Sequence, residues 1–142
     1  MAVLADIHEK LPAALLPSLR AHAPSLILVP GDFVYGNLPT AGLKMEGSPL
    51  LPFFRTCCEI APTFISLGNH EWMLNASDLD LITATGATVL DNSWIELDGL
   101  VIGGLSSARV TEYQSFLNSG VEAETFTVNP LYLRFHSALS RP

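Results

Sequence analysis

The chain has 142 residues, of which 49% are hydrophobic and 15% charged, a composition typical of one folded domain with its own core. Its 14 acidic and 7 basic residues give a net charge of −7, which argues against the basic patches that non-specific nucleic-acid binding requires. No apolar run approaches the ~18 residues of a membrane span, and no Lys/Arg-led signal peptide opens the sequence.

Two local features bear on the cellular location of the chain. Met1 already lies within a strand-like run, so the sequence is also compatible with a missing upstream segment, including one that associates with a membrane. Cys57 and Cys58 are the only cysteines, and adjacent cysteines rarely pair with each other. We expect two reduced thiols packed in a helix and a cytoplasmic chain.

The first half of the chain alternates between strand and helix patterns. Apolar runs at 1–5, 25–29 and 63–67 predict buried strands, and helix patterns at 9–23 and 50–60 lie between them. This β-α-β-α-β order predicts an α/β fold with a mostly parallel sheet and right-handed crossovers.

The second half is predicted to contain a further helix, a short strand and a hairpin. Ser77 is expected to cap a helix that begins at Asp78 and ends at Gly86. The remaining predicted elements are a strand at 87–90 and the two hairpin strands, 93–97 and 100–105, around the turn Asp98-Gly99.

Beyond residue 107 the patterns weaken. A helix is expected at 110–119, followed by an irregular acidic stretch at 121–129. A final helix is predicted at 130–139, because apolar residues recur there at positions i, i+4 and i+8.

Polar side chains follow each of the three strands predicted in the first half. Asp6 and His8 follow the first strand, Asp32 the second, and Asn69 with His70 the third. In extended backbone, Asp6 and His8 would point to the same side. Because ligands of parallel sheets gather at the carboxyl ends of the strands, we expect these side chains to meet and to hold divalent ions that attract a phosphate.

The three motifs Asp6-x-His8, Gly31-Asp32 and Gly68-Asn69-His70-Glu71 resemble, in order, spacing and strand context, those of the calcineurin-like metallophosphoesterases. The resemblance is strongest to the single-domain bacterial phosphodiesterase branch. It implies a partial αββα sandwich, with a mostly parallel sheet built from β-α-β units and a C-terminal hairpin. It also divides the chain into the N-terminal part of a metallophosphoesterase-like domain at 1–107 and an irregular or helical tail at 108–142, where the family's C-terminal half is cut off.

The resemblance implies a role for each matching residue. Asp6 and His8 would hold one metal ion, Asp32 would bridge two ions, and Asn69 would hold the second. The two divalent ions would be drawn from Mn, Fe, Zn, Ni and Co. A metal-bridging hydroxide would attack phosphorus in line, and His70 would steady the phosphoryl oxygen or protonate the departing alkoxide.

The chain departs from the family pattern in two places. Many relatives carry a second Asp three residues after the Asp of the Gly-Asp motif, which orients the catalytic histidine. Here that position is Tyr35, and Glu71 is the alternative support for His70. The family also completes its metal sites with C-terminal histidines, including a Gly-His-x-His motif, whereas the only late histidine of this chain is His136.

These observations lead to two functional hypotheses. The first is a metal-dependent phosphoesterase, an incomplete copy that hydrolyses a phosphomonoester, phosphodiester or pyrophosphate of a small molecule at a dinuclear metal centre. The alternative is a non-catalytic module or inactive fragment of the same fold that acts only in protein interaction. A fold that stops early exposes a sheet edge, so we also expect self-association.

Overall fold

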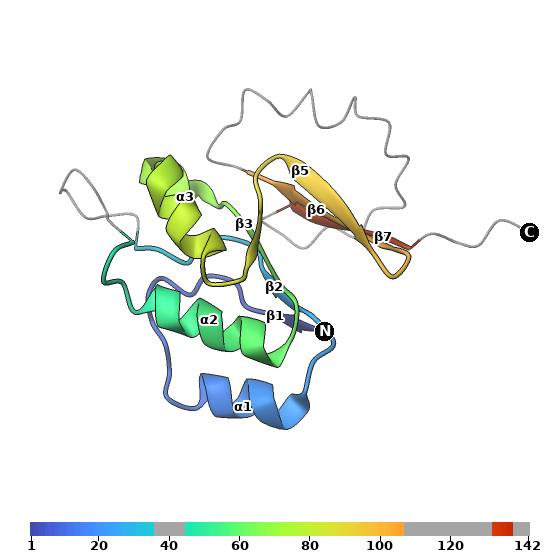
Figure 1. Ribbon diagram of the computed structural model, residues 1–142, viewed down its shortest axis with the longest axis horizontal. Coiled ribbons are helices and arrows are strands. Elements are labelled where there is room, and N and C mark those ends of the chain that lie inside the picture. The colour runs from blue at the N-terminus through green and yellow to red at the C-terminus, as the bar shows by residue number, and fades with distance from the viewer. Residues whose placement is uncertain (36–44, 107–131, 138–142) are drawn as a thin grey trace, which may run out of the picture.

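A computed structural model describes residues 1–35, 45–106 and 132–137, and its elements form three layers. Helices cover one face of a four-stranded parallel sheet, and a three-stranded antiparallel sheet covers the other face (Figure 1). The strand order is β1-β2-β3-β4 in the first sheet and β5-β6-β7 in the second. The layers confirm the predicted mixed α/β architecture with a parallel sheet.

The helices and strands differ from the predicted segments mainly in length. Their bounds, in chain order, are β1 (Ala2–Val3), α1 (Leu15–His22), β2 (Ile27–Val29), α2 (Leu50–Ile60), β3 (Thr63–Ser66), the 3₁₀ helix η1 (Asn69–Met73), α3 (Ala76–Thr83), β4 (Thr88–Leu90), β5 (Ser93–Leu97), β6 (Leu100–Leu105) and β7 (Tyr132–Ser137).

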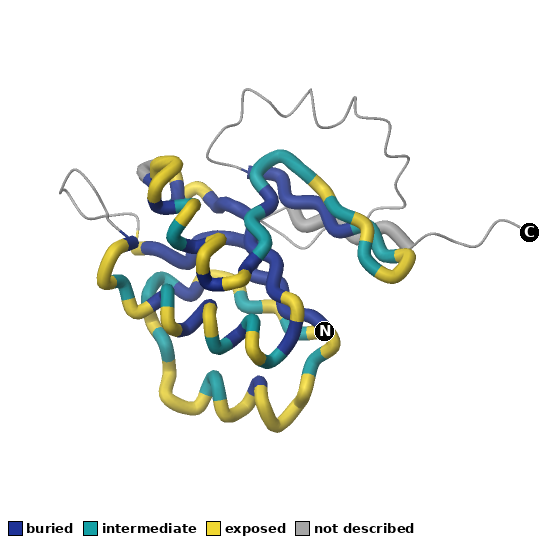
Figure 2. The backbone as a smooth tube through the Cα atoms, viewed as in Figure 1, coloured by how far each residue is buried: buried dark blue, intermediate teal, exposed yellow. Residues whose placement is uncertain are grey.

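Alternate residues of the central strands face two different cores. In β2, Ile27 and Val29 pack against the helices, whereas Leu28 packs toward the second sheet. In β3, Phe64 faces the second sheet and Ile65 faces the helices. Figure 2 shows these central strands buried along their length, while α1 is exposed over most of its surface. Coverage on both faces explains why the strands read as unbroken apolar runs.

Helix α1 begins later than the predicted segment 9–23. It starts at Leu15, which places Pro17 in its first turn. A proline there lacks only an N–H that the first turn leaves unpaired, whereas in the interior of a longer helix it would remove a hydrogen bond. The proline therefore marks the start of the helix and not a kink.

The cap of α3 is Asn75 and not the predicted Ser77. The Asn75 side chain accepts a hydrogen bond from the Asp78 backbone N–H at 3.2 Å, and Asp78 Oδ2 accepts one from the Asn75 N–H at 3.1 Å. This reciprocal capping box requires the three-residue spacing of Asn75 and Asp78, which the prediction overlooked. Asp78 Oδ1 also accepts a hydrogen bond from the Met45 N–H at 2.9 Å, so this buried carboxylate anchors the segment that leads into α2.

The C-terminal helix predicted at 130–139 is wrong. Residues Tyr132–Ser137 form strand β7, which pairs antiparallel with β6 from Leu105 to Leu100. Pairing with the free edge of β6 outweighs a short helical pattern, because strand formation depends on the partner more than on local propensity. The hairpin is thereby extended to three strands. The helix expected at 110–119 and the stretch 121–129 lie outside the described residues, and the division at residue 107 stays a prediction.

The β5–β6 hairpin was predicted correctly. Its turn residues Asp98 and Gly99 both have positive φ angles, 51° and 77°, as a two-residue hairpin turn requires.

No helix in the described ranges combines the length and the apolar character that crossing a bilayer requires.

Both cysteines are free, and Cys57 is fully buried in α2. Burial raises the pKa of the Cys57 thiol to about 12 from its ordinary 9.0, and the neighbouring Cys58 adds a smaller effect in the same direction. The folded chain therefore keeps this proton at a pH where the unfolded chain loses it.

We expect Cys57 to make the fold less stable as the pH rises between 9.0 and about 12, because only the unfolded thiol gains from ionising there. The Cys57→Ala variant should lose less of its free energy of unfolding over this range, whatever its stability at neutral pH. Urea denaturation at several pH values measures the slope. Cys58→Ala serves as the control and should keep most of the wild-type dependence; equal slopes for Cys57→Ala and the wild type would contradict the assignment.

Candidate metal centre

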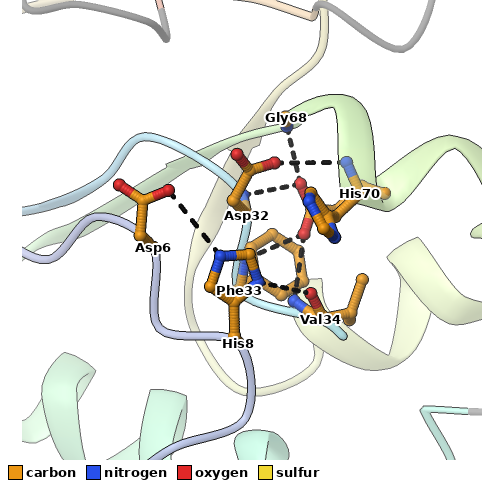
Figure 3. A network of polar contacts seen from close by, with 8 residues as sticks. Asp6, His8, Asp32, Phe33, Val34, Gly68 and His70 are labelled. Carbon is orange, nitrogen blue, oxygen red and sulfur yellow. Dashed lines mark hydrogen bonds and ion pairs between the residues drawn. The ribbon is translucent and has the colours of Figure 1, made fainter. Parts of the chain in front are cut away.

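The segments that follow β1, β2 and β3 leave the parallel sheet at the same edge. Hydrogen bonds between backbone atoms join the first two segments, from the His8 N–H to the Asp32 carbonyl at 3.0 Å and from the Glu9 N–H to the Phe33 carbonyl at 2.8 Å. Figure 3 shows Asp6, His8, Asp32 and His70 lying around this junction.

The imidazole of His8 is held in an orientation that suits a metal ligand. Its Nδ1 lies 3.3 Å from the Val34 carbonyl oxygen, and its Nε2 lies 3.8 Å from Asp6 Oδ1. When Nδ1 carries the proton, it donates to the carbonyl and leaves the Nε2 lone pair facing Asp6. Metal-binding histidines are commonly oriented in this way, and one ion between Nε2 and Oδ1 could contact both atoms.

The backbone that carries these residues is not extended, contrary to our expectation for Asp6 and His8. The φ angles of Asp6, His8, Glu9 and Asp32 are 52°, 45°, 58° and 51°, all in the left-handed region. The side chains of Asp6 and His8 therefore approach each other through a tight turn and not through strand alternation. Each such residue costs about 1–2 kcal/mol relative to an ordinary conformation, and such conformations concentrate at functional sites.

Asp32 lies where the β2 and β3 segments touch. It is only 4% exposed, and its Oδ1 accepts a hydrogen bond from the His70 backbone N–H at 3.1 Å. A β-carbon on Gly68 would collide with the Asp32 carboxylate, and one on Gly31 would collide with the Gly68 backbone. Both glycines are thus required because the two backbones pass too closely to admit any side chain.

Glu71 is 2% exposed and accepts hydrogen bonds from four backbone amides. Its Oε2 accepts from the N–H groups of Asp32 at 2.8 Å and Gly68 at 2.6 Å. Its Oε1 accepts from those of Phe33 at 2.8 Å and Val34 at 3.1 Å. Burial raises the pKa of the Glu71 carboxyl above its ordinary value, and the hydrogen bonds from the amides act in the opposite direction.

Two of the remaining candidate residues, His70 and Tyr35, lie beside the His8 ring. The His70 ring meets the His8 ring edge-on, with centroids 4.6 Å apart, and the exposed Tyr35 ring lies edge-on to His8 at 6.1 Å. Asn69 is exposed at the start of η1. His136 belongs to β7 and pairs with Val101 in the second sheet.

The donor set fits a divalent ion in kind but fills only part of a coordination shell. Carboxylate and imidazole groups suit the ions considered above, and the Asp6–His8 pair has a suitable spacing. Nevertheless, no group of three or more His, Cys, Asp or Glu side chains within residues 1–35, 45–106 and 132–137 is arranged to hold a metal ion. A complete site therefore needs further ligands or a small rearrangement of these segments.

Glu71 was predicted as an alternative support for His70, but its amide partners were not predicted. The signal was its position three residues after Gly68, where a capping-box glutamate turns back to the preceding backbone N–H. The partners in the β2 segment are 37 to 39 residues away, and no local pattern identifies them.

Residues 1–136 match the model of a family described as calcineurin-like phosphoesterase. The matched range includes all three strand-end segments and reaches into β7. None of the curated proteins compared with the chain matches it.

Gly68→Ala is expected to lower the free energy of unfolding by about 1–3 kcal/mol, because the added methyl group must displace the Asp32 carboxylate and backbone. Gly99→Ala is the matched control. Its β-carbon meets open space, so only the unfavourable φ of 77° remains, at about 1 kcal/mol. Urea denaturation compares the two variants, and a smaller loss for Gly68→Ala would contradict the close approach.

Asp6→Gly is expected to leave the free energy of unfolding unchanged or raise it by up to about 1 kcal/mol, because glycine adopts a positive φ without steric penalty. Asp98→Gly, in the β5–β6 turn, should behave in the same way. Only Asp6→Gly should weaken the binding of Mn²⁺, measured by calorimetric titration. Unchanged Mn²⁺ affinity in a folded Asp6→Gly protein would remove Asp6 from the donor set.

Proposed function

Because the chain belongs to the calcineurin-like phosphoesterase family, we propose that it is a metal-dependent phosphoesterase that acts on a phosphate ester of a small molecule. The observation that carries this proposal is the meeting of three strand-end segments, with His8 Nε2 facing Asp6 and Asp32 joined to the His70 backbone. The reaction would be hydrolysis of a phosphomonoester, phosphodiester or pyrophosphate, as phosphodiesterases and phosphatases perform it.

Two divalent ions, drawn from Mn, Fe, Zn, Ni and Co, would occupy the site. Asp6 and His8 would bind the first ion, Asp32 would lie between the two, and Asn69 would bind the second. When bound, the ions supply positive charge that attracts the phosphate and stabilises its transition state. The contacts of His8 with Val34 and of Asp32 with His70 support these roles. Side chains that bind metal ions are usually oriented by hydrogen bonds to neighbouring groups that do not themselves touch the metal.

Other residues of the chain would bind the substrate, transfer a proton and support the site. His70, whose ring lies against His8, would hold the phosphoryl oxygen or give a proton to the leaving alkoxide. Glu71 would hold the segments after β2 and β3 in place, because its buried carboxylate accepts hydrogen bonds from their backbone amides. Tyr35 would border the site beside His8.

A second candidate function is a non-catalytic module that acts through protein contacts. The observation that favours it is the partial donor set within the described residues. The two-residue strand β1 lies at one edge of the first sheet, and its Val3 is 41% exposed. An exposed strand edge can pair with another chain, so this edge supports self-association. A cytoplasmic location remains a proposal from the sequence.

The two functions are distinguished by titrating the metal-free chain with Mn²⁺ or Zn²⁺ and assaying nitrophenyl phosphate and bis-nitrophenyl phosphate. The enzyme should bind two ions and release nitrophenol, and Asp32→Ala should abolish both properties. His70→Ala should lower kcat by about 10²- to 10⁴-fold while ion binding is retained.

His22→Ala is the matched control, because His22 is an exposed histidine at the end of α1, where its Nδ1 contacts the Ser18 carbonyl at 2.8 Å. It should have no effect on turnover. Weak binding of a single ion with no nitrophenol release from either substrate would favour the module, and sedimentation would then test its self-association.

A further inference from the structure

We propose that Glu71 is a positioning residue that sets the geometry of the metal site by holding all three strand-end segments together. The inference rests on the proposed function, because it gives Asp32, His8 and Asn69 their roles toward the ions. Glu71 itself contacts none of the reacting groups in this assignment. Its effect passes through the backbones of the ligand-bearing segments.

The two carboxylate oxygens of Glu71 accept hydrogen bonds from different amides. Oε2 accepts from the Asp32 and Gly68 amides, so it bridges the segment after β2 and the segment after β3. Oε1 accepts from the Phe33 and Val34 amides and so also ties the segment after β2 to the segment after β3, which carries Glu71. Both oxygens therefore join the two segments, and Oε2 also makes a local contact with Gly68.

The first segment is reached through a short chain of contacts. Glu71 fixes the Val34 amide, and the Val34 carbonyl oxygen lies 3.3 Å from His8 Nδ1. The orientation of the His8 ring, with Nε2 toward Asp6, thus depends on a residue that Glu71 holds. The same carboxylate places the Asp32 backbone, whose side chain accepts from the His70 amide.

A neutral isostere cannot reproduce this arrangement. In Glu71→Gln one carboxylate oxygen becomes an NH₂ group, and each oxygen position faces two backbone donors. Whichever way the amide is turned, its N–H groups oppose two N–H groups, so either the Asp32 and Gly68 hydrogen bonds or the Phe33 and Val34 hydrogen bonds are lost. The variant keeps the volume of the buried side chain, so its effect reports the hydrogen bonds.

The matched control is Asp78→Asn. Asp78 is also buried, at 3% exposed, and also accepts backbone N–H groups, from Met45 and Asn75, but it lies on α3 and not on a ligand-bearing segment. A purely structural role for Glu71 would make the two variants alike. A positioning role makes them differ in ion binding at equal fractions of folded protein.

The experiment measures Mn²⁺ binding by calorimetry, kcat and KM with bis-nitrophenyl phosphate, and amide hydrogen exchange by NMR. We expect Glu71→Gln to weaken Mn²⁺ binding by about 10- to 100-fold and to lower kcat more than it raises KM. It should also speed exchange at one of the two amide pairs, either Asp32 and Gly68 or Phe33 and Val34. Asp78→Asn should leave Mn²⁺ affinity within about twofold of the wild type and should speed exchange at Met45 or Asn75 instead.

Unchanged Mn²⁺ affinity in folded Glu71→Gln, or equal losses in both variants, would overturn the inference. If Glu71→Gln does not fold, hydrogen exchange of the wild-type chain decides. The four amides lie outside helices and strands, so rapid exchange there would refute the contacts and slow exchange would support them. A wild-type chain that binds no Mn²⁺ would refute the proposed phosphoesterase, and the exchange data would still show whether Glu71 joins the segments.

Discussion

The arrangement of the site depends on one buried carboxylate and the backbone amides around it. A segment that leaves a sheet loses its ladder partners, and its N–H groups must find other acceptors if they are buried. Glu71 supplies two acceptor oxygens to four such groups, three in the β2 segment and one at Gly68. A charged acceptor strengthens these hydrogen bonds, and donors on both segments make it a cross-link between them.

The close approach that Glu71 stabilises is possible only because side chains are absent there. Gly31 and Gly68 face each other and Asp32 without room for a β-carbon. The candidate metal ligands Asp6, His8 and Asp32 adopt left-handed backbone conformations that side chains disfavour. The sheet beneath is packed on both faces, and close-packed cores resist the shifts that would relieve this local cost.

The second sheet contributes to that support from the opposite side. Gly104 of β6 lies against Leu90 of β4, and this contact lets the two sheets pack closely. The end of β6 is also joined to the end of β4, since the Ser106 hydroxyl donates to Asp91 at 2.6 Å and its N–H donates to the Asn92 side chain at 3.0 Å. The strand ends of both sheets are therefore fixed by side-chain oxygens in place of ladder hydrogen bonds.

The sequence by itself determined the elements whose signals are local. Helix α2 at Leu50–Ile60, strand β3 and the hairpin turn at Asp98-Gly99 follow from apolar spacing and turn chemistry within a few residues. The order of polar residues after three strands likewise indicated the family. Tertiary structure alone decided that residues 132–137 form a strand, that Asp6 and His8 meet through a left-handed turn, and that Glu71 holds the β2 segment. Each of these outcomes depends on a hydrogen-bond partner or a packing neighbour distant in the chain, and a local pattern cannot specify which distant segment that partner belongs to.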